Sequence, residues 1–261
     1  MRENSLRALW ADGGVGLGGW LTVPSGFSAE IMASAGFDWV CIDMQHGMIA
    51  EPQMIEMLQG ISSTDVTPLV RVPRNEAGVI GKCLDAGAWG VIVPMVNSAE
   101  EAMAAADACR YAPEGIRSYG PLRANYYAGF DYFSRANEQV LCIGMVETRS
   151  AVERVDEIAS VPGVDGIYIG PADLSITLGL PPAPDQSDPN FTNALERVVE
   201  SCRQHGVVPG IAGNADTAPK RIEQGFRFVE VASDVGLLGV GAGRALAQVK
   251  PTAVPSKSAY L

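Results

Sequence analysis

Eight short runs of β-forming residues, each followed by a stretch with helical signals, recur along this 261-residue chain. The runs span residues 15–23, 39–45, 68–72, 90–96, 141–148, 166–170, 207–212 and 228–232. Their apolar residues are continuous rather than alternating, which is typical of parallel strands buried on both faces. Eight strand–helix units without an evident linker are what a (β/α)8 barrel requires. We therefore expect a single (β/α)8 TIM-barrel domain over residues 1–261.

Two stretches interrupt the regular spacing of strands and helices. Residues 111–137 are rich in Gly, Tyr and Arg, and residues 181–189 contain a cluster of prolines. We expect both to lie over the C-terminal face of the barrel, where long loops usually carry function. A long helix is predicted over 189–205, because Gly206 directly follows it as a stop signal.

Charge and composition exclude several classes of function. The chain has 19 Lys and Arg against 30 Asp and Glu, a net charge of −11, and such a surface repels nucleic-acid phosphates and anionic lipid. No apolar run reaches the roughly 18 residues of a transmembrane helix, and the N-terminus lacks the apolar core of a secretory signal. The five cysteines are scattered, without Cys-x-x-Cys spacing, which favours a reducing cytoplasm and no structural zinc. We expect a cytoplasmic protein that acts on small molecules.

Two kinds of cofactor or covalent chemistry are disfavoured by position. Residues 14–19 read Gly-x-Gly-x-x-Gly, but they precede a strand and open no helix. A dinucleotide site requires the motif to follow a strand and to open a helix. The four lysines are Lys82, Lys220, Lys250 and Lys257, and none of them ends a predicted strand. A Schiff base needs a desolvated lysine at the reaction site. We therefore expect no Schiff-base mechanism.

Charged and polar residues follow the predicted strands at the point where each strand ends. They are Asp43, His46, Arg71, Glu147 and Asp173. The carboxyl ends of all strands meet at one mouth of a barrel, where the active sites of such enzymes lie. Isolated solvated charges are the simpler explanation for any one of them, but not for five that each follow a buried strand. The sequence therefore predicts a polar site at this mouth.

Three of these residues suggest a chemistry. Glu147 and Asp173 follow neighbouring strands, where two carboxylates can either share a proton or hold a hard divalent cation such as Mg²⁺. His46 is one of two histidines and is the candidate for proton transfer, whereas His205 stands at a predicted helix C-terminus and is expected to be structural. Residues 170–174 read GPADL, a turn whose unpaired amides can cradle a substrate carboxylate beside the cation.

With these motifs the chain resembles the HpcH/HpaI aldolase family, the metal-dependent class II pyruvate aldolases. The resemblance covers nearly the whole chain and rests on the segments GGWL, AGFDWVCIDMQHG, PLVRVP, LDAGAWGVIVPMV, RYAPEGIRSYG, MVET and VDGIYIGPADL. It implies a (β/α)8 barrel that assembles as a homo-hexamer with the last helix exchanged between subunits. It also implies reversible, divalent-metal-dependent aldol cleavage of 4-hydroxy-2-oxo acids to an aldehyde and pyruvate or hydroxypyruvate, through an enolate that the metal stabilises. The metal implied is Mg²⁺ or Mn²⁺, with Co²⁺ as a further option.

The resemblance also implies roles for individual residues. Glu147 and Asp173 match the metal ligands, His46 the catalytic histidine, Asp85 the carboxylate paired with it, Arg71 the arginine on the ketone oxygen, the amides of Ala172 and Asp173 the carboxylate cradle, and Trp20 an aromatic residue of the pocket wall. One position departs from the family, which commonly has Glu where this chain has Gln45. Gln45 cannot carry the negative charge with which a glutamate would tune metal-bound water.

Two alternatives to an aldolase stay open on the sequence. Another lyase on the same barrel, such as one that cleaves acyl-CoA esters like the citrate lyase β-chain, would need a basic groove for the CoA phosphates, which the net charge of −11 disfavours. A non-catalytic oligomeric binding protein should have lost part of the Glu, Asp, His and Arg set, all of which is present. Residues 235–249 are apolar and rich in small side chains, which suits burial against a neighbouring subunit.

Overall fold

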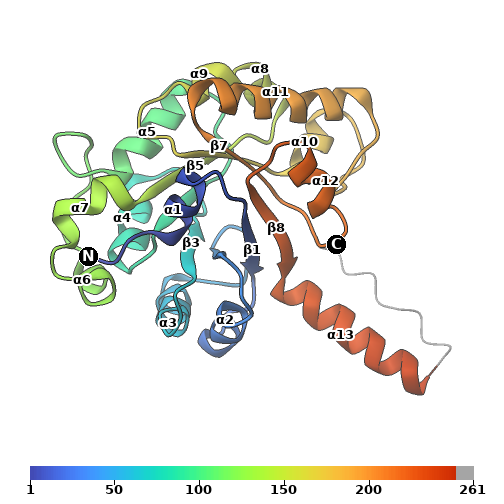
Figure 1. Cartoon of the computed structure of the whole chain (residues 1–261), viewed down its shortest axis with the longest axis horizontal. Helices are drawn as coiled ribbons and strands as arrows, with labels where there is room; N and C mark the ends of the chain where they lie inside the picture. The colour runs from blue at the N-terminus through green and yellow to red at the C-terminus, as the bar shows by residue number, and fades with distance from the viewer. Residues whose placement is uncertain (251–261) are drawn as a thin grey trace.

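Eight parallel strands close into a barrel in the order of the sequence, and β8 pairs with β1 (Figure 1). The computed structural model describes residues 1–250. The strands are β1 Gly16–Leu21, β2 Trp39–Asp43, β3 Thr67–Arg71, β4 Gly90–Val93, β5 Leu141–Met145, β6 Gly166–Ile169, β7 Val208–Ile211 and β8 Phe228–Ser233. All eight predicted strands and the predicted (β/α)8 class are thus confirmed.

Helices surround the barrel and connect its strands. They are α1 Ser5–Ala11, α2 Gly26–Ala33, α3 Glu51–Ile61, α4 Ala77–Asp85, α5 Ala99–Cys109, α6 Leu122–Ala128, α7 Tyr132–Gln139, α8 Arg149–Glu153, α9 Val155–Ala159, α10 Pro171–Thr177, α11 Pro189–His205, α12 Ala218–Glu223 and α13 Asp234–Val249. The predicted end of α11 is confirmed, because Gly206 takes the left-handed conformation, with φ of 69°, that terminates a helix. His205 lies in the last turn of this helix, as expected.

The apolar core has two layers, and the inner one fills the barrel from its amino end up to a cavity at its carboxyl end, whose lining it shares through Trp20, Met145 and Tyr168. Inward-facing side chains of the strands pack there around Trp39 and Phe228, whose ring centroids are 4.2 Å apart. Helix α1 closes the amino end by adding Leu6 and Trp10 to the same cluster. The outer layer lies between the strands and the surrounding helices. Only the carboxyl end of the barrel is therefore left for a polar site.

The expectation for residues 111–137 is wrong. This stretch follows helix α5 rather than a strand, so it runs toward the amino end of β5 and contains the helices α6 and α7. The backbone contact from Arg2 to Ala128 places it beside the N-terminus, away from the mouth of the barrel. The expectation for residues 181–189 is confirmed, because residues 182–184 line the cavity at the mouth.

Helix α13 leaves the barrel and projects away from it (Figure 1). Its first residue, Asp234, is buried and accepts hydrogen bonds from the amides of Thr22 and Val23, which fixes the helix to the end of β1. Beyond this anchor, Leu237, Leu238 and Leu246 are exposed. In the described residues, no helix combines the length and hydrophobicity that a membrane span demands.

Candidate active site

A cavity of about 340 Å³ opens at the carboxyl ends of the strands. Its lining comprises Trp20, Thr22, Asp43, His46, Arg71, Met145, Glu147, Tyr168, residues 170–173, residues 182–184, Ala212, Gly213, Glu230, Ser233 and Val235. Six of the seven residues to which the sequence assigned a role are among them, and only Asp85 is not. The mouth of the barrel therefore gathers the polar groups that the strand ends predicted.

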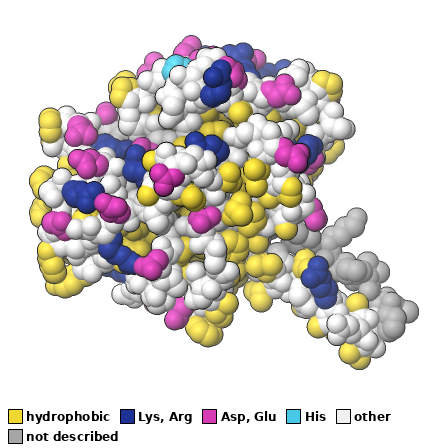
Figure 2. All heavy atoms as spheres, in the orientation of Figure 1, with side chains coloured by type: hydrophobic (Ala, Val, Ile, Leu, Met, Phe, Trp, Pro, Cys, Tyr) yellow, Lys and Arg dark blue, Asp and Glu magenta, His cyan; other side chains and the backbone are white. Residues whose placement is uncertain are grey.

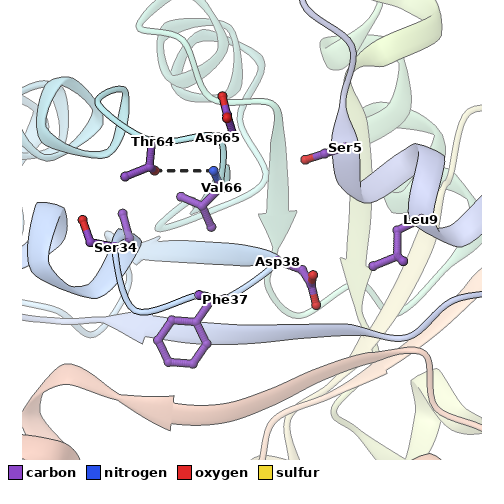
Figure 3. A pocket seen from close by; sticks show the side chains of 10 residues that line it. Ser5, Leu9, Ser34, Phe37, Asp38, Thr64, Asp65 and Val66 are labelled. Carbon is purple, nitrogen blue, oxygen red and sulfur yellow. Dashed lines mark hydrogen bonds between the residues drawn. The ribbon is translucent and has the colours of Figure 1, made fainter.

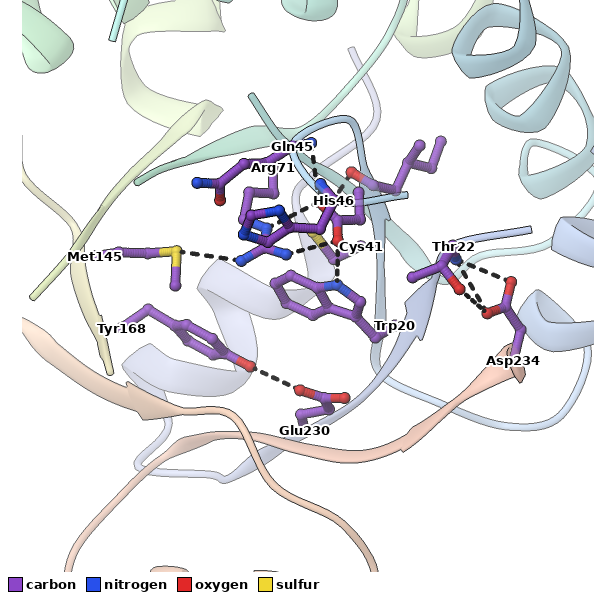
Figure 4. A network of polar contacts seen from close by, with 12 residues as sticks. Trp20, Thr22, Cys41, Gln45, His46, Arg71, Met145, Tyr168, Glu230 and Asp234 are labelled. Carbon is purple, nitrogen blue, oxygen red and sulfur yellow. Dashed lines mark hydrogen bonds and ion pairs between the residues drawn. The ribbon is translucent and has the colours of Figure 1, made fainter. Parts of the chain in front are cut away.

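A bidentate ion pair between Arg71 and Asp43 joins the ends of β3 and β2. The Nε and Nη2 atoms of Arg71 donate to Oδ1 and Oδ2 of Asp43, at 2.9 and 2.6 Å. Burial alone would raise the pKa of Asp43, but the hydrogen bonds and charge of Arg71 hold it below its usual value. Among residues 1–250, the only hydrogen-bond partner of the remaining nitrogen, Nη1, is the thioether of Met145, at 3.9 Å, a weak acceptor (Figure 4). Nη1 is thus the part of the guanidinium that a substrate oxygen can use.

Trp20 forms the wall beside this ion pair. Its indole nitrogen donates to Oδ2 of Asp43 at 3.2 Å, and the guanidinium of Arg71 lies 4.9 Å from its ring centroid. The ring of Tyr168 stacks on Trp20 with centroids 5.7 Å apart and an interplanar angle of 17°. These contacts fix both the position of the guanidinium and the shape of the cavity.

Glu147 occupies a buried position just beyond the end of β5. Its Oε1 accepts a hydrogen bond of 2.8 Å from the amide of Met95. Met95 has a φ of 56°, which residues other than glycine rarely adopt. A Cβ atom on Gly170 would lie 2.4 Å from Oε2 of Glu147, so only glycine leaves room for this carboxylate. Burial raises the pKa of Glu147, and the nearby charge of Asp173 raises it further.

Asp173 and the amides beside it belong to the first turn of α10. Pro171 is the first residue of this helix, and Gly170 precedes it as the N-cap. The first amides of a helix have no acceptor within the helix, so those of Ala172 and Asp173 are available to an anion in the cavity. Asp173 is exposed to the cavity, whereas Glu147 is buried beneath it.

The donor set suits a hard divalent cation. Among the described residues, no group of three or more His, Cys, Asp or Glu side chains could hold a metal ion. Mg²⁺ and similar ions, however, commonly take one or two carboxylates and complete their coordination with water and substrate oxygens. Glu147 and Asp173 supply two such carboxylates, and a cation between them would remove the like-charge repulsion that raises the pKa of Glu147.

His46 and Gln45 follow β2 in a turn organised by Asp43. Oδ1 of Asp43 accepts hydrogen bonds from the amides of both residues, at 3.1 and 3.0 Å. The His46 imidazole is exposed at the cavity and is free to meet a ligand there (Figure 4). The Oε1 atom of Gln45 is buried and, within the described part of the chain, has no hydrogen-bond partner.

Within the chain, Asp85 is not paired with His46. Asp85 is the last residue of α4, which returns from the end of β3 to the start of β4, so it lies at the amino end of the barrel. Its Oδ1 accepts a hydrogen bond of 2.8 Å from the buried Arg117, which also donates to the hydroxyl of Tyr132. The carboxylate is thus engaged by a network within residues 111–137 and is absent from the cavity lining.

Tyr168 and Glu230 are cavity residues that the sequence reasoning missed. The hydroxyl of Tyr168 on β6 donates to Oε2 of Glu230 on β8, at 3.4 Å (Figure 4). Burial raises the pKa of Glu230 to about 8, against lowering contributions from Arg71, Tyr168 and the amide of Gly213. The signal was present in the sequence, because Glu230 is a single carboxylate within the otherwise apolar and small residues of FVEVAS.

A second hollow, of about 560 Å³, contains none of the residues to which the sequence assigned a role. It lies at the amino end of the barrel, near the starts of β2 and β3 (Figure 3). Its carboxylates are Asp38 and Asp65, and Asp38 accepts a hydrogen bond from the amide of Leu17. The lysines within the described residues are also remote, since Lys82 pairs with Glu51 and neither Lys220 nor Lys250 lines the cavity. Lys257 lies outside the described residues.

Comparisons with known proteins identify the family of the chain. A sequence profile of the family described as HpcH/HpaI aldolase/citrate lyase matches residues 17–239. The chain belongs to this family. A hydroxypyruvate/pyruvate aldolase from Rhizorhabdus wittichii is 39% identical over 248 residues, which cover 95% of this chain and 99% of the relative. A 4-hydroxy-2-oxo-heptane-1,7-dioate aldolase from Escherichia coli is 39% identical over 240 residues, covering 90% and 91%.

The solved structures lead to the same family. A crystal structure of an HpcH/HpaI aldolase/citrate lyase family protein from Burkholderia cenocepacia superposes with a TM-score of 0.88 at 34% identity, covering 95% of this chain and 99% of the other. The resemblance inferred from the motifs is thereby confirmed. The aldolase relatives also confirm the predicted enzyme class, a carbon–carbon lyase.

Proposed function

We propose that the protein catalyses reversible aldol cleavage of 4-hydroxy-2-oxo acids, giving an aldehyde and pyruvate or hydroxypyruvate. The observation that carries the proposal is the placement of the Arg71 guanidinium and the Glu147–Asp173 pair around one cavity. A cationic donor and a pair of carboxylates suited to a metal are what an enolate requires for stabilisation. The names of the two aldolase relatives agree with this substrate class.

Glu147 and Asp173 would hold a divalent metal, and Mg²⁺ or Mn²⁺ is our choice, with Co²⁺ as a further option. When bound, such a cation supplies Lewis-acid polarisation of the 2-oxo group and so favours the enolate. The exposure of Asp173 and the burial of Glu147 leave the cavity side open to substrate oxygens.

The chain's own residues bind and orient the 2-oxo acid. The amides of Ala172 and Asp173 receive its carboxylate at the start of α10. Nη1 of Arg71 donates to the 2-oxo oxygen, on which negative charge develops as the enolate forms. Trp20 and Asp43 hold the guanidinium in place for this contact, so its reorganisation during the reaction is small.

His46 moves the protons. In the cleavage direction, the hydroxyl at C4 loses its proton to the imidazole or to a water in contact with it. The C3–C4 bond then breaks and the aldehyde leaves. The electron pair of that bond remains on the 2-oxo acid, which becomes the enolate. A proton delivered to C3 completes the product. The exposed imidazole at the cavity edge allows His46 to exchange protons with solvent between turnovers.

The test is carbon–carbon bond formation by the metal-loaded protein. It should convert pyruvate or hydroxypyruvate and members of a panel of aldehydes into 4-hydroxy-2-oxo acids, detected by mass spectrometry. The chelated protein should be inactive, and re-addition of Mn²⁺ should restore activity. A metal-loaded, folded protein that forms no product with any pair of donor and aldehyde would refute the proposal.

We further propose that the protein is a homo-hexamer in which α13 packs on a neighbouring subunit. The support is the exposure of Leu237, Leu238, Leu246 and Val249 along a helix that projects from the barrel, where apolar side chains are visible (Figure 2). Light scattering should give six times the 27.5 kDa chain mass. The replacement Leu238→Glu should reduce that mass. A monomeric mass of the wild type, or an unchanged mass of Leu238→Glu, would count against the exchange.

We also place the protein in a reducing cytoplasm. All five cysteines are free and buried, so the fold makes no use of a disulfide among the described residues.

A further inference from the structure

A carboxyl group at the floor of the cavity has no part in the proposed mechanism. Glu230 lies within β8, level with Gly18 of β1, whereas Trp20 is level with Ser233 at the end of β8. Glu147 and Asp173, by contrast, lie beyond the ends of their strands. Glu230 is therefore deeper in the barrel than the proposed metal-binding pair, and it is part of the cavity lining.

The surroundings of this carboxyl keep it neutral and leave its proton unused. Burial raises the pKa of Glu230 to about 8, so the acid form prevails at neutral pH. Oε2 accepts a hydrogen bond from Tyr168, at 3.4 Å, and the amide of Gly213 also donates to the carboxyl. With the phenol donating to Oε2, no further acceptor is recorded within residues 1–250 for the proton that the neutral acid carries. The group can thus donate one hydrogen bond into the cavity.

The 2-oxo acid and the aldehyde enter the same cavity, and the one that binds deeper is the one that contacts Glu230. The 2-oxo acid must reach Arg71 and the metal-binding pair, so it occupies the inner part of the cavity, and the aldehyde approaches from the mouth. The carboxylate of the 2-oxo acid and its 2-oxo oxygen are held by the start of α10 and by Arg71. C3 must present one face to the aldehyde at the mouth, so the part of the donor left to face the floor is the substituent on C3.

We propose that Glu230, together with Tyr168, binds a hydroxyl group on C3 of the donor and so selects hydroxypyruvate-type donors over pyruvate. This inference rests on the proposed function and names its specificity-determining residue. A neutral acid and a phenol offer a donor and an acceptor to a hydroxyl, and neither adds a negative charge beside the anionic donor. A methyl group in the same place leaves the O–H of Glu230 without a partner, which is the usual source of discrimination by a polar pocket.

The test compares the two donors with one aldehyde, using the metal-loaded protein. The ratio of kcat/KM for hydroxypyruvate to kcat/KM for pyruvate should fall by about 10-fold to 100-fold in Glu230→Leu. Glu230→Gln keeps one donor and one acceptor and should retain most of the ratio. Tyr168→Phe keeps the ring stacked on Trp20 and should lower the ratio by a smaller factor. Glu196→Gln, an exposed change on α11, is the matched control and should leave the ratio unaltered.

Three outcomes separate this inference from the proposed function. A wild-type protein that forms no product with either donor refutes the proposed function. An active wild type whose ratio is the same in Glu230→Leu overturns the inference alone, as does a parallel loss with both donors, since that would make Glu230 a structural residue. If Glu230→Leu fails to unfold cooperatively, Glu230→Gln and Tyr168→Phe decide, and an unchanged ratio in Tyr168→Phe contradicts the shared hydroxyl site.

Discussion

Both carboxylate oxygens of Asp43 are hydrogen-bonded by one side chain, Arg71, through Nε at 2.9 Å and Nη2 at 2.6 Å. The same carboxylate also accepts the backbone amides of Gln45 and His46. One buried acid therefore sets the position of Arg71, the proposed enolate-stabilising group, and of the turn that carries His46, the proposed proton-transfer residue. Its loss should affect stability and catalysis together.

Asp43→Ala should lower the free energy of unfolding by about 3–5 kcal/mol, because it leaves the buried charge of Arg71 unpaired. Urea denaturation of the metal-free protein measures this effect. The control is Glu76→Ala, which removes the exposed partner of Arg74 and should change stability by less than about 1 kcal/mol. Equal effects of the two replacements would show that the Asp43–Arg71 pair contributes no more to the free energy of unfolding than an exposed ion pair.

Glu147→Ala and Asp173→Ala should each weaken Mn²⁺ binding by more than the roughly 10–100-fold that is usual for residues around a metal ligand. The reason is that the cavity offers the cation no other pair of carboxylates at the ends of β5 and β6. Calorimetric titration with Mn²⁺ measures the affinity directly, without reference to activity. Glu196→Gln should titrate like the wild type, and a variant of either ligand that did so would remove it from the metal site.

Gly170→Ala should disturb the same site through a single methyl group. The added Cβ would lie 2.4 Å from Oε2 of Glu147, so the carboxylate must move away from the position it holds against Met95. We expect weaker Mn²⁺ binding and a lower kcat. Gly81→Ala, where the structure leaves open space within α4, should instead stabilise the protein by about 0.5–1 kcal/mol. Unaltered Mn²⁺ affinity in Gly170→Ala would mean that Glu147 tolerates displacement.

The roles of His46 and Arg71 can be separated by exchange of pyruvate methyl protons with deuterated water. His46→Ala should slow cleavage by about 10²–10⁴-fold, as is usual for a positioned acid–base group, and should leave Mn²⁺ affinity intact. Arg71→Lys should impair both exchange and cleavage, because an ammonium cannot form the two-point contact with Asp43. Loss of the metal in His46→Ala would identify His46 as a ligand rather than a proton carrier.

The sequence was sufficient for the barrel and for the rim of the site, for a physical reason. Parallel strands buried on both faces are written as continuous apolar runs, and the first charged residue after each run marks the carboxyl end of a strand. Arg71 and Glu147 were found in this way, and closure of the barrel brings them together whatever the details of the loops.

Features that depend on which end of the barrel a segment reaches were harder to predict. Residues 111–137 looked like an active-site loop, but they follow a helix and therefore lie at the amino end. Asp85 accepts a hydrogen bond there from Arg117, a contact between distant segments that no local sequence pattern predicts. Glu230 was missed because it lies inside β8, whereas the polar residues predicted for the mouth lie at the ends of their strands or just beyond them.

The titration of Glu230 predicts a pH dependence of stability. The ordinary pKa of a glutamic acid, 4.5, applies to the unfolded chain, and the pKa in the folded protein is about 8. Between these values the folded state binds the extra proton. The stabilising contribution is therefore complete below about pH 4.5 and is lost progressively as the pH rises to about 8, at up to roughly 1.4 kcal/mol per pH unit.

Glu230→Gln replaces the titratable carboxyl group by an amide of the same shape, so the variant cannot take up this proton. The difference in unfolding free energy between the wild type and this variant should therefore shift in favour of the variant from about pH 5.5 to about pH 8.5, as measured by urea denaturation. The raised pKa of Glu147 acts in the same direction, but it is common to both proteins and cancels in the difference. The titratable and charged groups that face Glu230 are retained in both proteins; they are Arg71, Asp43, Cys41 and Tyr168. A difference that stayed constant over this range would show that Glu230 is already ionised at neutral pH, because only a group that takes up a proton on folding can produce the slope.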